Sequence, residues 1–444
     1  GLRIIKEALS AEFNLFGREE QAEFLKSLTK GSAKKAQQAA EKISRIKNSL
    51  EDFDEETRKT YEAYQAALKQ NNTFDFDDLI LTPIKILENN PPVKFKNTFT
   101  HIMVDEYQDI NPAQYTLIRL LAQQGSSLCA IGDSDQAIYG FRGADAGAFL
   151  SFDKDFKNAA TIKFTRNYRS TGVVLSASNS LIRNNQKRIE KDIVPTKEQG
   201  SAIRHISAPD ERAEGEFIVR EIEARIGGTS HHRMRRTGGT GDASGGSFRF
   251  SDFAVIFRTN AQARAIEEAF RASGIPYQVI GRRSSLQARE IGETIAYLQS
   301  LIKLNAPGDT GPVDADANEA KLLTTADYFD PRADAVILTT LHTAKGLEFK
   351  IVFIAGCEQG LIPYTGMKDD TDVEEERRLF YVGMTRAKNV LFLLHARQRF
   401  LYGQRTAPSP SPFLKEIPDP LIKETVIPDK VKKQKEPDKQ MGLF

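Results

Sequence analysis

The hydrophobic pattern of the chain changes near residue 101. Before that point apolar residues are sparse and spaced as on one face of a helix. Residues 33–70 are rich in Ala, Lys, Glu and Gln and contain no Gly or Pro. These residue types lose little conformational freedom in a helix. The pattern therefore predicts a mostly helical region over residues 1–72.

After residue 101, short continuous apolar runs alternate with helical patterns. The runs cover residues 101–105, 128–133, 160–165, 203–207, 253–258, 335–341, 351–357 and 390–396. Such an alternation predicts an α/β fold, with parallel strands buried beneath helices on both faces of the sheet. Ligands of these sheets bind beyond the carboxyl ends of the strands. We therefore looked for polar residues at the ends of the runs.

Three segments lack the apolar residues needed to form a core. Residues 227–247 are crowded with Gly, Ser and Thr, and we expect a mobile loop there. Residues 305–332 also have a loop composition. The tail over residues 408–444 is rich in Pro and Lys, and we expect it to be disordered.

Charge and cysteine content narrow the class of protein. The formal net charge is only +2, which excludes a uniformly basic surface and requires any nucleic-acid site to be local. Cys129 and Cys357 both lie in apolar runs, so we expect buried free thiols in a reducing cytoplasm. No Cys/His spacing indicates zinc.

No apolar run approaches the roughly 18 residues needed to cross a bilayer, so we expect a cytoplasmic protein without a membrane partner.

The strongest chemical signal is the run from Asp105 to Asp109, Asp-Glu-Tyr-Gln-Asp, at the end of an apolar strand. A carboxylate such as Asp105 at this place can hold Mg²⁺, usually through water. Glu106 can orient or deprotonate a water that attacks a phosphate. Asn111 and Gln114 have the spacing of a capping box, with Pro112 at the first helical position, so a helix should follow. The alternative is an acidic loop without function.

The next two strands end in further candidates. Gln136 could sense a γ-phosphate or its attacking water. Phe141 and Arg142 offer an aromatic face and a cation, a combination that suits base stacking of single-stranded nucleic acid. Tyr168 could stack on a nucleobase, and Arg169 could bind a phosphate through its fork of donors. Taken one by one, each of these pairs could equally be ordinary core or surface residues.

The C-terminal half holds two more segments of this kind. Gly346 permits close backbone approach to a ligand, and Glu348 could accept hydrogen bonds from ribose hydroxyls. Arg386 lies near the end of an amphipathic helical pattern over residues 374–388 and could act as an arginine finger. The alternative for this segment is a solvated basic helix.

Together and in this order, these segments resemble the UvrD/PcrA/Rep family of superfamily-one DNA helicases, over residues from about 70 to about 415. The runs 74–79 and 257–260, with Arg264, are also similar to the family pattern. The resemblance implies two RecA-like parallel-sheet motor domains of the P-loop NTPase type. We expect a helical insertion subdomain at residues 1–72, an N-terminally truncated first RecA-like domain at 73–163 and a second at 164–407.

The resemblance also implies roles for individual residues. Asp105 would help to bind Mg²⁺, Glu106 would be the catalytic base, and the γ-phosphate contacts would be Gln136, Arg169 and Arg386. Tyr168 would stack on the adenine of ATP, and Gly346 and Glu348 would touch the nucleotide. The residues expected to contact single-stranded DNA are Phe141, Arg142, Arg258, Asn260 and His342. The family usually has Trp in place of Phe141. The implied activity is that of an ATP-dependent DNA helicase that moves in the 3′-to-5′ direction. The implied partners are single-stranded DNA and junctions between single-stranded and duplex DNA.

The chain departs from the family pattern in two places. It has no Gly-x-x-x-x-Gly-Lys-Ser/Thr loop, and no Gly-Lys dipeptide at all. We therefore expect a truncated first domain with an open sheet edge or exposed core, and an isolated chain that neither hydrolyses ATP nor unwinds DNA at family rates. Residues 305–332 are also too few for the large helical subdomain that the family usually carries there. The alternative function is a non-catalytic DNA-binding or scaffold protein with the same fold.

The C-terminus carries a separate motif. Gln440, Met441, Leu443 and Phe444 resemble the short peptide that bacterial replication proteins insert into the sliding clamp. A Lys-rich tether ending in apolar anchors suits such docking. The alternative is a tail of arbitrary sequence.

Overall fold

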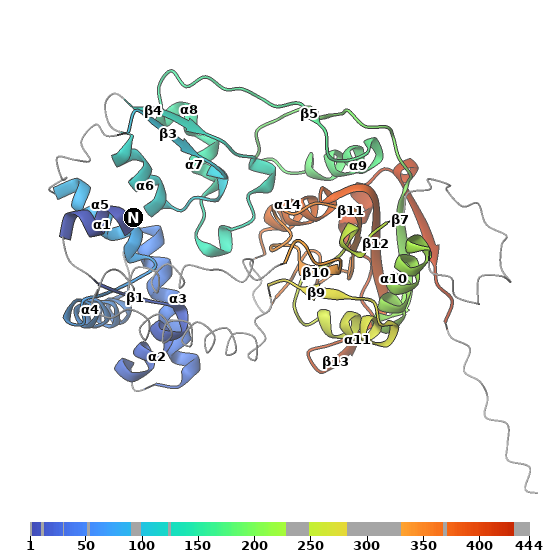
Figure 1. The fold of residues 1–444 in the computed structure, drawn as a ribbon, viewed down its shortest axis with the longest axis horizontal. Helices are drawn as coiled ribbons and strands as arrows, with labels where there is room; N and C mark the ends of the chain where they lie inside the picture. The colour runs from blue at the N-terminus through green and yellow to red at the C-terminus, as the bar shows by residue number, and fades with distance from the viewer. Residues whose placement is uncertain are drawn as a thin grey trace, which may run out of the picture.

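The computed structural model describes residues 2–9, 13–29, 31–50, 54–89, 99–122, 126–227, 248–281, 330–366 and 371–429 (Figure 1). The predicted segments 228–247 and 305–329 and the clamp-like peptide at residues 440–444 lie outside these ranges. Within the described part, no helix is long and apolar enough to cross a membrane.

The N-terminal region is helical, as predicted, with one addition. Its helices are α1 (Leu2–Leu9), α2 (Arg18–Thr29), α3 (Ala33–Ser49), α4 (Glu55–Gln70) and α5 (Asp78–Asn89). The Ser32 and Asp54 side chains cap α3 and α4 by accepting hydrogen bonds from backbone N–H groups three residues later. The addition is a parallel pair of short strands, β1 (Asn14–Phe16) and β2 (Thr73–Asp75). Three residues are too few to give a strand pattern in the sequence.

A buried lysine joins this helical region to the strand β2. The side chain of Lys47 is 0% exposed, and its Nζ lies 2.7 Å from both Asp75 Oδ2 and Asp78 Oδ1. Asp75 also accepts a hydrogen bond from the Tyr64 hydroxyl at 3.0 Å. The run 74–79 noted in the sequence is therefore a structural link, because its two carboxylates neutralise a cation that α3 buries.

A small parallel sheet follows, made of β3 (His101–Val104) and β4 (Ser127–Ala130). Between the strands lie the 3₁₀ turn η2 (Tyr107–Asp109) and the helix α6 (Pro112–Leu121). The predicted capping box is present: Asn111 Oδ1 accepts from Gln114 N at 2.8 Å, and Gln114 Oε1 accepts from Asn111 N at 3.1 Å. We refer to residues 99–163 as the first unit and to residues 164–429 as the second unit.

One face of the small sheet is uncovered in the described part of the chain. Met103 is 74% exposed, and its register partner Cys129 is exposed as well, so the prediction that Cys129 is buried is wrong. Residues 160–165 do not form the predicted strand, and Ile162 and Phe164 are 82% and 86% exposed. The physical reason is common to both: these apolar residues have no described element to pack against or pair with. The described residues therefore leave these apolar side chains exposed.

The rest of the first unit consists of short elements. They are η3 (Ser134–Gln136), η4 (Gly140–Arg142), α7 (Ala146–Leu150) and α8 (Phe152–Asp155). The second unit then begins with the two-residue strands β5 (Arg166–Asn167) and β6 (Val194–Pro195), which pair in parallel around the helix α9 (Gly172–Ile182).

The second unit is built on a sheet of eight strands in the order β14-β7-β12-β11-β8-β10-β9, with β13 paired to β12. All pairs are parallel except β12 with β13. The strands are β7 (Ile203–Asp210), β8 (Phe253–Phe257), β9 (Tyr277–Val279), β10 (Val336–Thr340), β11 (Phe349–Ile354), β12 (Ala387–Leu401), β13 (Gln404–Thr406) and β14 (Ile422–Val426). The apolar runs predicted as strands after residue 200 are all strands of this sheet.

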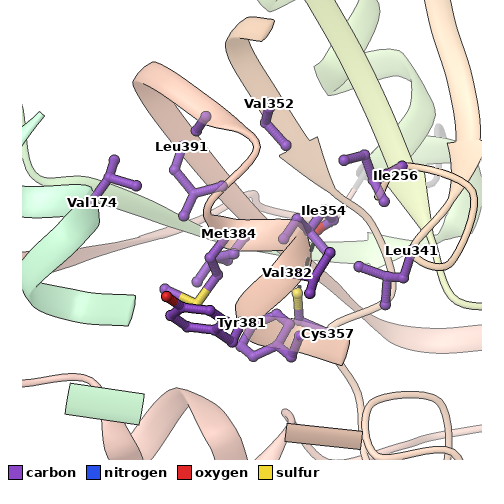
Figure 2. Close-up of a cluster of buried hydrophobic side chains, with 14 of the residues drawn as sticks. Val174, Ile256, Leu341, Val352, Ile354, Cys357, Tyr381, Val382, Met384 and Leu391 are labelled. Atoms are coloured by element: carbon purple, nitrogen blue, oxygen red, sulfur yellow. Dashed lines mark hydrogen bonds between the residues drawn. The ribbon is translucent and has the colours of Figure 1, made fainter. Parts of the chain in front are cut away.

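Helices cover both faces of this sheet, as the continuous apolar strands predict. One core joins α9 and α14 (Val373–Met384) to the sheet through residues such as Val174, Ile354 and Val382 (Figure 2). The other core joins α10 (Glu211–Ile226) and α11 (Ala263–Ser273) to the opposite face. A short turn, η6 (Phe250–Asp252), leads into β8. The loops after the strands are therefore held on a sheet whose central strands are buried.

The prediction of a disordered tail is wrong for residues 408–429. This segment forms η8 (Pro412–Glu416), η9 (Asp419–Leu421) and the edge strand β14, which pairs with β7. Phe413 is 1% exposed, and its ring lies 6.0 Å from that of Phe380. A few buried apolar residues fix the segment in spite of its Pro- and Lys-rich composition, which dominated the sequence pattern.

Candidate functional site

The acidic strand tip lies directly after β3. Glu106 has a left-handed backbone (φ 51°), and its N–H donates to Asp105 Oδ1 at 2.9 Å. Both side chains are solvent-accessible beside a hollow of about 380 Å³, which is lined by Val104, Asp105, Glu106, Asp109, Ile110, Gln114, Leu117 and Ile118. Gln108 donates to Glu106 and accepts from the backbone of Asp133 at 2.9 Å. The tip therefore offers two accessible carboxylates in a fixed orientation.

A lysine from the second unit reaches into this acidic tip. Lys345 Nζ lies 3.1 Å from Glu106 Oε2, forms an ion pair with Asp109 and donates to the backbone carbonyl of Gln136 at 3.0 Å. Its side chain is 6% exposed. Burial raises the pKa of Asp109, and Lys345 opposes that rise. From the sequence alone, no role was assigned to Lys345 or to Asp109. Their only signal in the sequence is that each lies next to residues singled out there, Gly346 and the run from Asp105.

Arg386 is buried close to the same carboxylates. It is 2% exposed, and its guanidinium donates to the carbonyls of Val382 and Leu347 at 2.9 and 3.2 Å and to the hydroxyl of Thr385 at 3.1 Å. Burial lowers its pKa to about 10, with Arg169 adding to the effect and Glu106 and Glu348 opposing it. Arg386 therefore lies within electrostatic reach of Glu106, although it follows a helix of the other unit.

Arg169 and Glu348 form an ion pair next to Arg386. Arg169 Nε lies 2.7 Å from Glu348 Oε2, and Lys388 Nζ lies 2.6 Å from Glu348 Oε1. Lys388, and then Arg169, lower the pKa of Glu348 to about 2. Tyr168 is 69% exposed beside this pair, and Gly346 has φ 85° two residues before Glu348. The structure thus brings the predicted nucleotide contacts into one region of the second unit.

Gln136 belongs to a polar cluster that also links the two units. Its Nε2 donates to Asp133 Oδ2 at 2.7 Å, and Asp133 is paired with Lys191. Burial alone would raise the pKa of Asp133, but Lys191 and Gln136 together lower it. Arg188 binds both oxygens of the buried Asp135, at 2.9 and 2.8 Å. Arg188 and Lys191 follow α9 in a stretch without a recognisable motif, which is why sequence reasoning missed them.

Aromatic rings gather around Phe141. Phe141 is 59% exposed, its ring meets the His342 ring edge-on at 5.1 Å, and Tyr139 lies about 6 Å from each of them. Arg142 is placed over Phe141 at 5.3 Å. Burial, with Arg258 and Arg142, lowers the pKa of His342 to about 3, so the ring is neutral at neutral pH. We call Tyr139, Phe141, Arg142 and His342 the aromatic platform.

The other two predicted DNA contacts lie differently. Arg258 forms a two-point ion pair with Glu376, at 3.1 and 2.7 Å, and covers the Tyr364 ring at 4.8 Å. Its guanidinium is therefore engaged within the second unit. Asn260 is exposed two residues further along the chain. The structure brings Phe141, Arg142 and His342 together, with Arg258 close enough to His342 to affect its pKa.

The eight-stranded parallel sheet covered by helices, and the acidic strand tip facing cations of the second unit, fit a RecA-like architecture of the P-loop NTPase type. Two family models match the chain: the UvrD/REP helicase N-terminal domain over residues 2–157, and the UvrD-like helicase C-terminal domain over residues 162–306 and 317–398. The chain therefore belongs to the UvrD/REP helicase family.

Two PcrA proteins agree with this assignment. The chain is 32% identical to an ATP-dependent DNA helicase PcrA of Staphylococcus aureus (strain NCTC 8325), over 82% of this chain and 64% of that protein. It is 31% identical to the PcrA of Staphylococcus epidermidis (strain ATCC 12228), over 86% of this chain and 68% of that protein. The C-terminal domain of a possible DNA helicase from Lactobacillus plantarum WCFS1 aligns at 18% identity, over 58% of this chain and 98% of that chain, with a TM-score of 0.31. The chain spans 64% of the length of the Staphylococcus aureus relative.

Proposed function

We propose that this chain is the nucleotide- and DNA-engaging core of an ATP-dependent DNA helicase that moves 3′-to-5′ along single-stranded DNA. The observation that carries the proposal is the contact of Lys345 with Glu106 and Asp109, beside the buried Arg386. Two units that meet through acids on one side and cations on the other can bind a triphosphate between them and respond to its loss.

The residues at the strand tip suit an ATP–Mg²⁺ complex. Asp105 presents accessible carboxylate oxygens, the ligand type that Mg²⁺ prefers, beside the hollow at the tip. When bound, the complex supplies the phosphoanhydride bond and a cation that neutralises its charge. Glu106 would accept the proton of the attacking water, and Arg169 and Arg386 would hold charge on the γ-phosphate side. Tyr168 would contact the base.

The aromatic platform would bind the bases of single-stranded DNA, including the strand at a junction with duplex. Phe141 offers an exposed ring for stacking, and Arg142 adds a cation next to it. His342 would contribute as a neutral ring. Because Phe141 replaces the Trp that is usual in the family, stacking is retained with a smaller aromatic surface.

The DNA part of the proposal is tested by Phe141→Ala. Base stacking contributes on the order of 1–3 kcal/mol per base, so we expect single-stranded DNA affinity to fall about tenfold or more. The measurement is fluorescence anisotropy with a labelled oligothymidylate. Phe164→Ala is the matched control, because Phe164 is also highly exposed but is not part of the platform. Equal affinities of wild type and Phe141→Ala would reject the platform.

A further inference from the structure

The loop that carries Phe141 belongs to the first unit but is held by the second. This loop, residues 133–142, contains no long helix or strand of its own. Arg378 Nε of α14 donates to the backbone carbonyl of Ala137 at 2.9 Å, and both residues are buried. One turn earlier on the same helix, Glu375 reaches the backbone at the other end of the loop. The helix α14 therefore holds the main chain of the loop at two points.

Glu375 supplies a cap that the loop lacks. The 3₁₀ turn η4 begins at Gly140, and its preceding residue, Tyr139, makes no capping hydrogen bond with its side chain. The first N–H groups of a helical turn have no partner within the turn. Glu375 Oε1 accepts the Gly140 N–H at 3.1 Å, and the same carboxylate accepts the Phe141 N–H. A carboxylate from the opposite unit thus satisfies both donors.

The fit at this contact is tight. A Cβ atom placed on Gly140 would lie 2.4 Å from Glu375 Oε2, closer than real Cβ contacts. Any larger residue at position 140 would therefore push the carboxylate away. The next residue in the turn is Phe141, whose ring is placed against His342 of the second unit. The position of the stacking ring consequently depends on the bond between Glu375 and the turn.

We infer that Glu375 is a positioning residue for single-stranded DNA: by capping the turn that begins at Gly140, it holds Phe141 in the stacking position and ties the platform to the second unit. The inference rests on the proposed function, since it assumes that the platform binds DNA. Glu375 itself does not touch the bases. An acidic residue near a DNA site ordinarily weakens binding through charge repulsion. Here we expect removal of Glu375 to weaken DNA binding, which is the opposite effect.

The test uses the 444-residue chain with two probes, a labelled oligothymidylate for affinity and an oligonucleotide containing 2-aminopurine for stacking. Glu375→Ala is expected to lower affinity about five- to tenfold and to reduce quenching of 2-aminopurine by stacking. Glu375→Gln, which keeps one acceptor oxygen, should restore part of both signals. Gly140→Ala displaces the carboxylate without changing any charge and should reproduce the effect of Glu375→Ala.

Glu374→Ala is the matched control. It makes the same change of charge on the neighbouring residue, but the Glu374 carboxylate accepts from the backbone of Gln186 and Lys187, within the second unit. We expect unchanged or slightly tighter DNA binding in this variant. If Glu375→Ala and Gly140→Ala bind like Glu374→Ala while Phe141→Ala is weakened, the inference is overturned and the platform stands. If Phe141→Ala binds like wild type, the platform fails and the inference fails with it.

Discussion

At the scale of single residues, the site is shaped by side chains whose charge is set by burial. The His342 ring meets the Phe141 ring, and burial, with Arg258 and Arg142, lowers its pKa to about 3. Lys345 places a buried cation between Glu106 and Asp109, and Glu348 is kept ionised by Lys388 and Arg169. The His342 ring of the platform is therefore neutral, whereas the side chains around the acidic tip are charged. The two parts of the site are chemically distinct although they share the segment from His342 to Glu348.

The neutral state of His342 should make stability depend on pH. The folded pKa of about 3 lies below the ordinary value of about 6.5, so the unfolded chain takes up the proton first as pH falls. The contribution of His342 to stability is therefore complete above about pH 6.5 and is lost as pH falls toward 3. In His342→Gln, the loss of unfolding free energy between pH 7 and pH 5 should be smaller by on the order of 1 kcal/mol.

The measurement for His342 is urea denaturation at several pH values. His101→Gln is the control, because it removes a histidine that is exposed on β3. Identical pH profiles for wild type and His342→Gln would show that the ring is not held neutral by the fold.

At the scale of elements, two helices, α14 and α3, connect different parts of the molecule through charged side chains. The helix α14 carries Glu375 and Arg378 on its N-terminal half and leads to Arg386 at its end, so one helix touches both the platform loop and the acidic site. In the N-terminal region, α3 contributes the buried Lys47 that ties the helices to β2 and α5. Both connections are made by charged groups with little access to water, where an unpaired partner is costly.

Lys47→Met should destabilise the N-terminal region strongly. The substitution keeps an unbranched side chain of similar size but leaves the carboxylates of Asp75 and Asp78 buried without their cation. Breaking a buried pair in this way costs about 3–5 kcal/mol. The change is measured by guanidinium denaturation followed by far-ultraviolet circular dichroism. Lys59→Met is the control, since Lys59 pairs with Glu55 at 3.6 Å on the surface, where a pair contributes at most about 1 kcal/mol. Equal stability of the two variants would contradict the proposed role of Lys47.

At the scale of the whole molecule, the two parallel sheets differ in how well they are covered. The large sheet of the second unit has eight strands and a core on each face, whereas the small two-stranded sheet of the first unit leaves Met103 exposed. The acidic tip lies at the end of the small sheet, and the described residues provide no glycine-rich loop beside it. The DNA platform, by contrast, is assembled fully from described residues of both units. The two activities of the proposed motor should therefore separate in this chain.

We expect the 444 residues to bind single-stranded DNA without releasing phosphate from ATP. The platform needs only Phe141, Arg142 and His342, whereas hydrolysis needs backbone amides and a lysine of the Gly-Lys type, and the sequence has no Gly-Lys dipeptide. The measurement is a phosphate-release assay with and without oligothymidylate. DNA-stimulated turnover by these residues would contradict the expectation. In a protein that joins them to a Gly-Lys-Thr loop, Arg386→Ala should abolish turnover and leave DNA binding intact.

The sequence by itself determined the class of fold and most strand positions after residue 200. Continuous apolar runs have few other stable arrangements than buried parallel strands, and the capping box at Asn111 is a local signal complete within four residues. The same locality explains why Asp105 and Glu106 could be recognised: their chemistry depends on a strand end, which the pattern marks. The strand predicted at residues 160–165 is not formed, because the hydrophobic pattern reports only the tendency of a segment to be a strand. Pairing also requires a partner strand, which the pattern does not reveal.

Only the tertiary structure decided which of these local features meet. Lys345 beside Glu106, Arg188 on Asp135 and Glu375 beneath Gly140 join residues from the two units that lie far apart in the chain. Tertiary packing also orders residues 408–429, because Phe413 is buried against Phe380 of α14. Periodicity reports the environment of one segment, whereas an ion pair or a cap depends on a second segment whose position is set by packing. The charges could therefore be read from the sequence, but their partners could not.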